Sequence, residues 1–228
     1  MDAITENSIR QEQIESMGRL MAGLAHDMKN HLGIIRESNG LMDDILAMGV
    51  LDEDEVALQR LKNSIAAIER RVIISANMMH HLSGLAHRSD TVYSSFPIHD
   101  LIEEEYTFLE RFSRLRQISV VFEFGAPLPV LYNDPALLQH VFYRVYAVCL
   151  EQMENGADLT IVTEGEGQAV VIRFCLSGTS AMNFEKLQES SLQAAVEKLG
   201  GKLERSDSEA DNVDIRLTVS SLTGDDTP

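Results

Sequence analysis

The sequence predicts a fold of the α plus α/β class in two parts: an antiparallel helical hairpin that forms a dimeric four-helix bundle, and then a two-layer α+β domain. Three observations support this prediction. Apolar residues recur at helical spacing along two long early segments, a polar stretch covers residues 88–95, and helical and strand-like patterns then alternate. With 228 residues, the chain is long enough for both domains. We expect the hairpin over residues 1–88, the second domain over 96–221 and a loose tail over 222–228.

The first segment predicts one long helix from about Ile9 to Met48, because it contains no proline and ends at Gly49. Its apolar positions are spaced by three and four residues, which places them on one stripe. The stripe consists of Met17, Leu20, Leu24, Met28, Leu32 and Ile35.

The second segment predicts a helix from Asp52 to about His87, with Glu55 as the capping-box partner of Asp52. Its stripe consists of Leu58, Leu61, Ile65, Ile68, Val72, Met79 and Leu82. Two long helices joined by a few residues make an antiparallel hairpin. Because a lone hairpin cannot cover both stripes, we expect a homodimer in which two hairpins form a four-helix bundle.

Mixed periods predict the elements of the second domain. Helices are expected over residues 97–116, 133–154 and 183–199, the second with a cap at Asp134 and proline at its first position, the third ended by Gly200. The expected strands cover residues 117–124, 159–164, 169–176 and 213–219. Gly165-Glu166-Gly167 is expected as the turn of a hairpin between the two middle strands.

Composition limits the partners and the compartment. Lys plus Arg total 19 and Asp plus Glu total 36, so the formal charge is 19 − 36 = −17, which argues against nucleic acid or an anionic membrane surface as partner. Cys149 and Cys175 lie in apolar runs and are expected to be buried, reduced thiols. The sequence shows no secretory signal and no apolar stretch of membrane-spanning length, so we expect a soluble, cytoplasmic protein.

His26 is the candidate reactive residue. It lies two positions from Leu24 and two from Met28, which turns it away from the apolar stripe and towards solvent. An exposed imidazole titrates near neutrality and can act as a nucleophile. The adjacent Asp27 could fix its tautomer, and Lys29 and Asn30, three and four residues on, share its face and could meet an anionic phosphoryl group. From spacing alone, an ordinary solvent-exposed histidine is the commoner explanation.

The stretch LMAGLAHDMKNHLGII resembles the H-box of bacterial two-component histidine kinases. In that family small residues precede the phosphoacceptor histidine, an acidic residue follows it, and Asn or Thr stands four positions later. The positions that fit are Gly23, Leu24, Ala25, His26, Asp27, Asn30 and Leu32. His31 stands where the commoner H-box has proline, a departure shared with kinase-like phosphotransfer proteins. The resemblance covers the hairpin and implies that His26 is a phosphoacceptor assisted by Asp27 and Asn30.

The second domain is similar to the ATP-binding domain of these kinases, but its nucleotide motifs are degenerate. Arg144 and Val148 replace the two asparagines of the N-box, the second of which helps to hold Mg²⁺ in the family. Leu176 stands in place of the aspartate that reads adenine. Ser180 replaces a glycine of the same motif, in which Gly178 is kept, and the chain that follows is too short for a glycine-rich lid. The resemblance therefore implies a retained fold without ATP, and no cofactor.

The second helix carries three histidines near its end, which are candidate metal ligands. His80, His81 and His87 have no carboxylate or thiolate at ligand spacing, so we expect solvated or interhelical histidines and no metal site.

The resemblance implies a phosphotransferase of the ChpT type that passes a phosphoryl group between receiver-domain aspartates through His26, without ATP-dependent autophosphorylation. Expected partners are response-regulator receivers, including those of hybrid histidine kinases, and each receiver would bring its own Mg²⁺. The expected docking surface contains Lys29, Ile34, Arg36 and Ser38. Two alternatives remain open at this point: a non-catalytic regulator that binds a kinase or receiver, and an active kinase with an unusual pocket.

Overall fold

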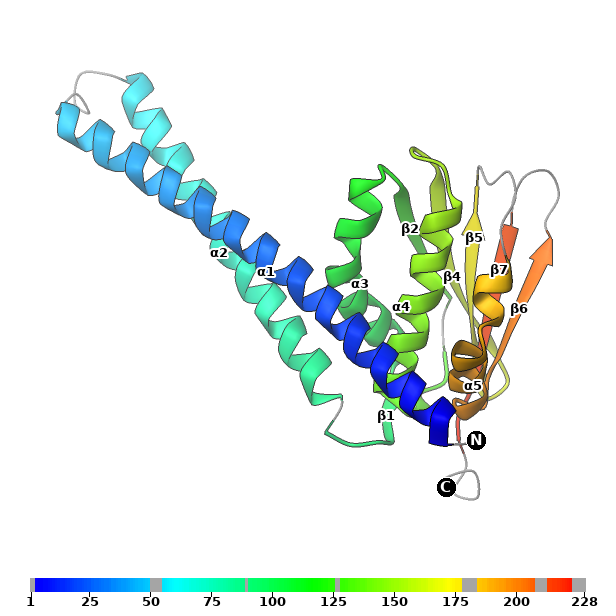
Figure 1. Cartoon of the computed structure of the whole chain (residues 1–228). Helices are drawn as coiled ribbons and strands as arrows, with labels where there is room; N and C mark the ends of the chain where they lie inside the picture. Colours follow the sequence, from blue (N-terminus) through cyan, green and yellow to red (C-terminus); the bar gives the residue numbers. More distant parts are fainter. Residues whose placement is uncertain are drawn as a thin grey trace. The chain divides into compact units, whose positions relative to one another are not determined.

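The computed structural model describes residues 3–49, 55–88, 90–125, 128–177, 184–207 and 213–222. It contains a helical region followed by an α/β domain with a mixed sheet, as the sequence predicts (Figure 1). The helices are α1 (Ala3–Met48), α2 (Glu55–His87), α3 (Ile98–Leu115), α4 (Pro135–Gln152), the 3-10 helix η1 (Phe184–Gln188) and α5 (Ser190–Lys198). The strands are β1 (Ser94–Phe96), β2 (Ser119–Phe124), β3 (Leu131–Asn133), β4 (Asp158–Glu166), β5 (Ala169–Leu176), β6 (Lys202–Asp207) and β7 (Val213–Ser220).

Contacts divide the chain into two compact units. One unit is the hairpin Leu20–Ser83, and the other contains the chain up to Arg19 together with everything from Gly84 onward. The first five turns of α1 therefore belong to the second unit, with the α/β domain. None of the described helices has the length and apolar character needed to cross a membrane.

The hairpin unit consists of the greater part of α1 and α2, which run antiparallel (Figure 1). Ala57, Ser64 and Met78 of α2 are buried and are separated by multiples of seven residues, and Leu24 and Ile45 of α1 are also buried. This spacing makes an inner seam of the kind found between packed antiparallel helices. The expected cap at Asp52 lies outside the described residues.

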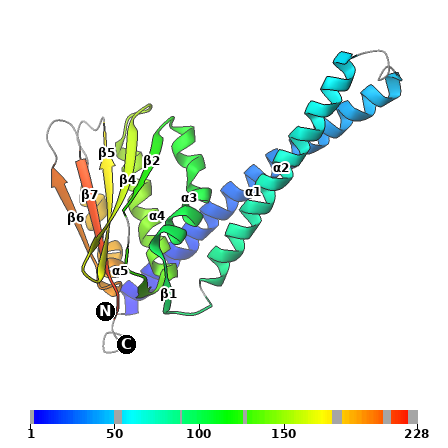
Figure 2. The same cartoon turned by 180° about the vertical axis from the view of Figure 1, so that it is seen from behind.

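The α/β domain is built on a five-stranded sheet with the order β2-β4-β5-β7-β6. Only the β2–β4 pair is parallel, and the other three pairs are antiparallel. Helices α3, α4 and α5 lie on one face of this sheet (Figure 2). The core between the layers contains Leu101, Ile102, Leu109, Leu138, Val141, Phe142, Val145, Ile161, Ile172, Phe174, Ile215 and Leu217.

Asn133 joins three elements at one end of this domain. Its side chain is fully buried, and Nδ2 donates hydrogen bonds of 2.9 Å to the carbonyl of Leu199 and 2.8 Å to that of Ser220. Its Oδ1 accepts from the amide of Asp134, whose own carboxylate caps α4 by accepting from the amide of Leu137 at 2.9 Å. The expected cap and first-position proline of α4 are thereby confirmed.

Four local predictions need correction. The helix expected over 183–199 is broken, because Glu189 has an extended ψ of 134° between η1 and α5. Gly165 and Glu166 belong to β4, and the turn is the two-residue Gly167-Gln168, where Gly167 has φ of 62°. Strands β1 and β3, with three residues each, were not expected. Cys175 is only partly buried, because alternate residues of β5 point away from the helices.

A buried carboxyl group lies on α3. Glu105 is 1% exposed, and its Oε2 has no hydrogen-bond partner among the described residues. Burial raises its pKa to about 8, although the guanidinium of Arg88 lowers it somewhat. The group is therefore protonated in the folded protein at neutral pH.

We expect Glu105→Gln to remove a pH dependence of stability. Because the folded pKa is raised from 4.5 to about 8, the contribution of this carboxyl is fully present below pH 4.5 and is lost as the pH rises towards 8. The expected loss for the natural protein is on the order of 3 kcal/mol between pH 4.5 and 7. Urea unfolding at both pH values should show a smaller difference for the variant. The exposed Glu103→Gln on the same helix is the control, and an equal effect of both substitutions would contradict this assignment.

Candidate functional site

His26 lies in the hairpin unit on α1, on the side opposite the inner seam. Its side chain is 53% exposed, whereas Leu24 two residues earlier is buried. Helical geometry alone produces this contrast, since two residues along an α-helix correspond to a rotation of about 200°. The imidazole is therefore open to a second protein.

Two neighbours converge on one ring nitrogen of His26. Nδ1 lies 3.3 Å from Oδ1 of Asp27 and 3.2 Å from Nδ2 of Asn30. When Nδ1 carries the proton, it donates to the Asp27 carboxylate, and Nε2 keeps a free lone pair. The Asn30 amide can turn its oxygen to the same N–H, because the two ends of an amide exchange by a flip. The arrangement favours the tautomer with its proton on Nδ1, in which Nε2 is the nucleophile.

A shallow hollow runs along the surface of α1 from the turn of His26 onward. Lys29, Asn30, Ile34 and Arg36 line it, together with Ala25, Met28, Leu32, Gly33 and Glu37. The hollow thus combines apolar side chains with two cations. Ser38, the remaining residue of the expected docking surface, is half-buried and lies outside the hollow.

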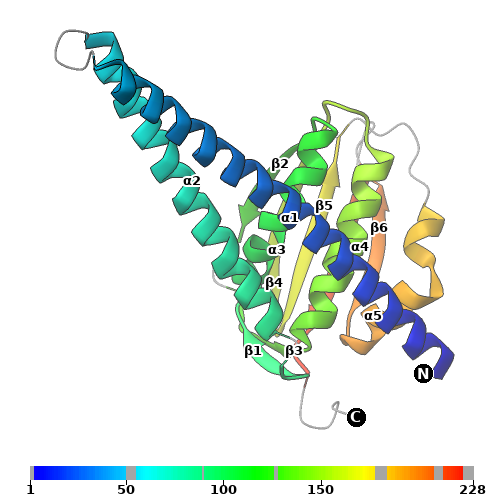
Figure 3. The same ribbon diagram turned by 60° about the vertical axis from the view of Figure 1, so that its left-hand side comes forward.

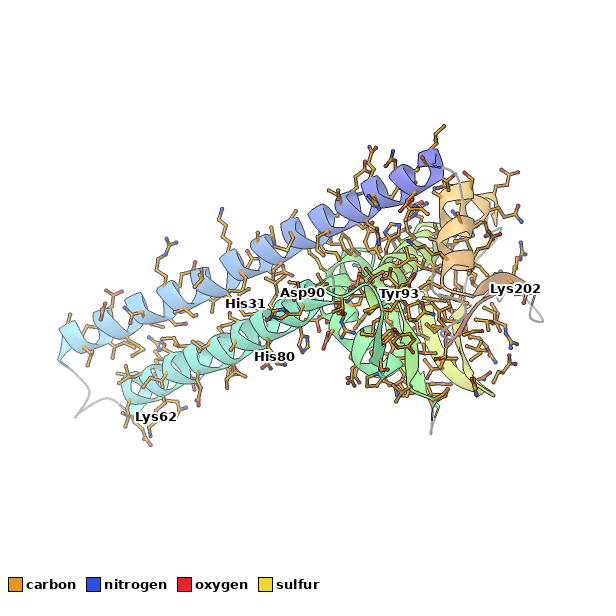
Figure 4. The ribbon with its side chains drawn as sticks, turned by 90° about the horizontal axis from the view of Figure 1, so that it is seen from below. His31, Lys62, His80, Asp90, Tyr93 and Lys202 are labelled. Atoms are coloured by element: carbon orange, nitrogen blue, oxygen red, sulfur yellow. The ribbon has the colours of Figure 1, made fainter. Side chains whose placement is uncertain are left out.

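His31 occupies the inner side of the hairpin. It is seven residues from Leu24 and from Ser38, and Figure 4 shows it on the side of α1 that faces α2. Its Nδ1 is buried and has no hydrogen-bond partner among the described residues, and the same is true of the hydroxyl of Ser75 on α2. The sequence identifies His31 only as a departure from the H-box, and its inward position follows from the spacing of the seam.

The positions that correspond to nucleotide-binding residues in the resembled domain hold buried apolar side chains. Leu176 is 1% exposed at the end of β5, where it pairs with Leu159 and Val213 of the adjacent strands. Val148 of α4 is 8% exposed. Neither side chain has an oxygen to bind a base or a hard cation. Gly178 and Ser180 lie outside the described residues.

The guanidinium of Arg144, which stands at the first N-box position of the resembled family, is held by two carboxylates. It forms an ion pair with Glu12 of α1, and its Nη2 lies 2.5 Å from Oε2 of Glu189 at the start of α5. The Arg144 side chain is only 16% exposed. This cation is therefore already compensated within the chain, and it is not a free phosphate ligand.

His140 lies one turn before Arg144 and meets the same part of α1. Its Nδ1 is 3.2 Å from the hydroxyl of Ser16, and its Nε2 is 3.9 Å from the carboxylate of Glu12. Burial and the nearby cation of Arg144 lower the pKa of His140 to about 4, whereas Glu12 raises it. The imidazole is neutral at pH 7 and serves as a hydrogen-bonding partner of the helix that covers it. Sequence patterns did not identify this cluster, because its members lie on distant segments.

Three histidines lie in the last turns of α2. His80 and His81 are adjacent residues whose ring centres are 6.0 Å apart, and Nδ1 of His87 lies 2.8 Å from the carboxylate of Asp90. Within the described part of the chain, no three His, Cys, Asp or Glu residues are grouped closely enough to hold a metal ion.

Comparison with known proteins identifies the fold. No protein-family model and no curated protein sequence matches the chain. Among solved structures, the histidine kinase AdeS of Acinetobacter baumannii is 16% identical with a TM-score of 0.50, and the match covers 82% of this chain and 97% of that one. The catalytic domain of histidine kinase ThkA is 17% identical with a TM-score of 0.50, covering 57% and 98%.

A longer match is the structure of histidine kinase ThkA in complex with the response regulator protein TrrA. It is 16% identical with a TM-score of 0.50, and the match covers 97% of this chain and 68% of that one. At such identities the likeness concerns the fold. The chain has a histidine-kinase-like fold, in which a helical region is followed by an α/β domain with the fold of a histidine kinase ATP-binding domain.

Proposed function

We propose that this protein is a histidine phosphotransferase of a two-component phosphorelay, which accepts a phosphoryl group on His26 and passes it on without autophosphorylation from ATP. The observation that carries the proposal is the state of His26. Its imidazole is half-exposed, and Nδ1 lies against the Asp27 carboxylate, which leaves Nε2 as the nucleophile.

The transfer needs little chemistry from this chain. Nε2 of His26 attacks the phosphorus of a receiver aspartyl phosphate as the acyl phosphate P–O bond breaks, and the aspartate leaves as a carboxylate. Asp27 holds the Nδ1 proton and stabilises the positive charge that develops on the ring. The reverse step delivers the phosphoryl group to a second aspartate, so His26 is regenerated after each cycle.

Receiver domains are the proposed partners. The hollow beside His26 offers Lys29 and Arg36 to an acidic rim and Ile34 to an apolar contact. Ser38 extends this surface along α1. Mg²⁺ would come with the receiver, and this chain would contribute Lys29 and Asn30 near the transferred group. The fold is shared with a kinase that was solved in complex with a response regulator.

ATP is not the proposed phosphoryl donor. Leu176 and Val148 are buried in the core at the positions that would meet adenine and Mg²⁺, and Arg144 is paired with carboxylates of the same chain. Each change removes a different nucleotide contact. Together they support a domain that keeps the shape of an ATP-binding domain without its ligand.

Phosphoryl transfer to His26 is the direct test. We expect the purified chain to take label from a phosphorylated receiver but not from radiolabelled ATP. The phosphoryl group should be acid-labile, as expected for a phosphoramidate bond, and should be absent from His26→Ala. Gel autoradiography after acid and base treatment measures both properties.

The exposed His80→Ala in the same hairpin is the matched histidine control, and it should keep full labelling. Label arriving from ATP alone would contradict the proposal that ATP is not the phosphoryl donor. Absence of label from a panel of phosphorylated receivers, with receiver binding intact, would instead favour the non-catalytic regulator.

The role of Asp27 predicts a second kinetic result. Asp27→Asn removes the charged acceptor that selects the Nδ1–H tautomer, so we expect the transfer rate to fall by about tenfold, or about 1.4 kcal/mol in activation free energy. Nitrogen-15 NMR of the imidazole should show a larger share of the Nε2–H tautomer. An unchanged rate together with an unchanged tautomer ratio would remove Asp27 from the mechanism.

A homodimer is part of the proposal. Leu58, Ile65, Val72 and Met79 recur at intervals of seven along α2, and each is between 37% and 52% exposed. An apolar stripe of this length is unusual on a solvated helix surface and is typical of a helix packed against another. A second hairpin would cover it and complete a four-helix bundle.

Charge on this stripe should separate the subunits. We expect the double variant Ile65→Asp and Val72→Asp to sediment as a monomer at concentrations at which the natural protein is a dimer, because burial of an unpaired carboxylate is strongly unfavourable. Analytical ultracentrifugation measures the change. The control is Ile73→Asp, which alters an equally exposed isoleucine about 100° around the helix from Val72. A natural protein that is already monomeric would refute the bundle.

A further inference from the structure

The first turns of α1 cover the outer face of α4. Ala3–Arg19, called the N-terminal segment below, belongs to the same compact unit as the α/β domain. Figure 3 shows this dark blue part of α1 crossing α4. Ile9 and Ser16 of the segment are buried, at 4% and 7% exposure. The contact is thus a packed interface between a helix and a domain.

Charged groups fix the position of the segment on α4. Glu12 forms an ion pair with Arg144 and lies 3.9 Å from Nε2 of His140, while the hydroxyl of Ser16 is 3.2 Å from Nδ1 of the same ring. Glu189 holds the other side of the Arg144 guanidinium at 2.5 Å. One cation therefore bridges two carboxylates that belong to α1 and to the start of α5.

We propose that the N-terminal segment is the resident ligand of the α4 surface around Arg144, held in place by the bridge Glu12–Arg144–Glu189. The kind of partner this surface fits is an acidic amphipathic helix that presents an apolar residue, a carboxylate and a hydroxyl in order, as Ile9, Glu12 and Ser16 do. The carboxylate of Glu12 takes the place of an external anion. This role does not depend on whether His26 carries a phosphoryl group.

The bridge holds the N-terminal segment firmly because its charged side chains are largely buried. The side chains of Glu12 and Arg144 are 25% and 16% exposed, so that loss of either partner leaves a poorly solvated charge. The neutral His140 adds no charge of its own at pH 7. Because the segment is covalently attached, its effective concentration at Arg144 is high, and a free anion competes with it poorly. The bridge thus sets how often the segment leaves the domain.

Hydrogen exchange of the full-length chain tests this assignment. We expect Glu12→Arg and Arg144→Glu each to speed the exchange of amides in the N-terminal segment by about tenfold or more, because undocking becomes more frequent. The double variant Glu12→Arg with Arg144→Glu should restore slow exchange, since an arginine at position 12 then faces two acids. Glu12→Gln, which keeps the shape of the side chain, should show the same direction with a smaller effect.

The matched control is Glu15→Arg, an exposed glutamate of the same segment that accepts a hydrogen bond from Gln11 of its own helix. An equal acceleration in this control, or a double variant no slower than the single ones, would overturn the proposal. Millimolar MgATP should leave the exchange of the natural protein unchanged, and acceleration by the nucleotide would also overturn it. Phosphoryl labelling of His26 in the same samples is an independent measurement, so failure of the relay and failure of the resident ligand are distinguishable.

Discussion

The burial of α4 is the constraint on which the arrangement of the second unit depends. Thirteen of its eighteen residues are buried, including Gln139, His140 and Tyr143, which a helix covered only by a sheet would expose. A helix of this kind requires neighbours on nearly all sides. The sheet and α3 cover part of it, and the first turns of α1 cover the face that carries His140 and Arg144. His140 and Arg144 are tolerated there because each meets a partner of opposite or complementary character, whereas the buried Nε2 of Gln139 has no hydrogen-bond partner among the described residues.

The proposed reactive site lies in the hairpin unit, whereas the buried polar contacts that join distant elements lie in the α/β unit. The proposed reactivity is concentrated on one exposed imidazole, and the groups proposed to support it, Asp27 and Asn30, come from the same helix within about one turn. Such a site needs no long-range assembly, because helical geometry alone brings its members together. In the α/β unit, by contrast, buried polar side chains hold elements of the fold together. Asn133 joins three elements, and Arg144 joins two. The proposed chemistry is therefore local, whereas the scaffold depends on distant contacts.

This division also explains what the sequence could predict. The two long helices, the cap at Asp134 and the outward position of His26 depend on residues close together in the chain, so local patterns were sufficient to predict them. The short strands β1 and β3 carry too few residues to show a period. The break at Glu189 and the pairing of Glu12 with Arg144 were missed, because Arg144 is separated from Glu12 by 132 positions and no local pattern records such a contact. The docking of the first turns of α1 on the α/β domain was not predicted for the same reason.

The charge bridge at Arg144 has an evolutionary consequence. If the ancestor of this domain bound nucleotide, as the resemblance implies, single substitutions would not restore nucleotide binding. Asparagine at position 144 would leave the carboxylates of Glu12 and Glu189 without a cation. An aspartate at position 176 would place a charge at a site where the present side chain is only 1% exposed. Each reversion would first weaken the fold before any binding was regained. On the proposal that the domain has lost its nucleotide, the contacts that replaced the nucleotide contacts would keep the ligand from returning, and the domain could diverge further as a scaffold.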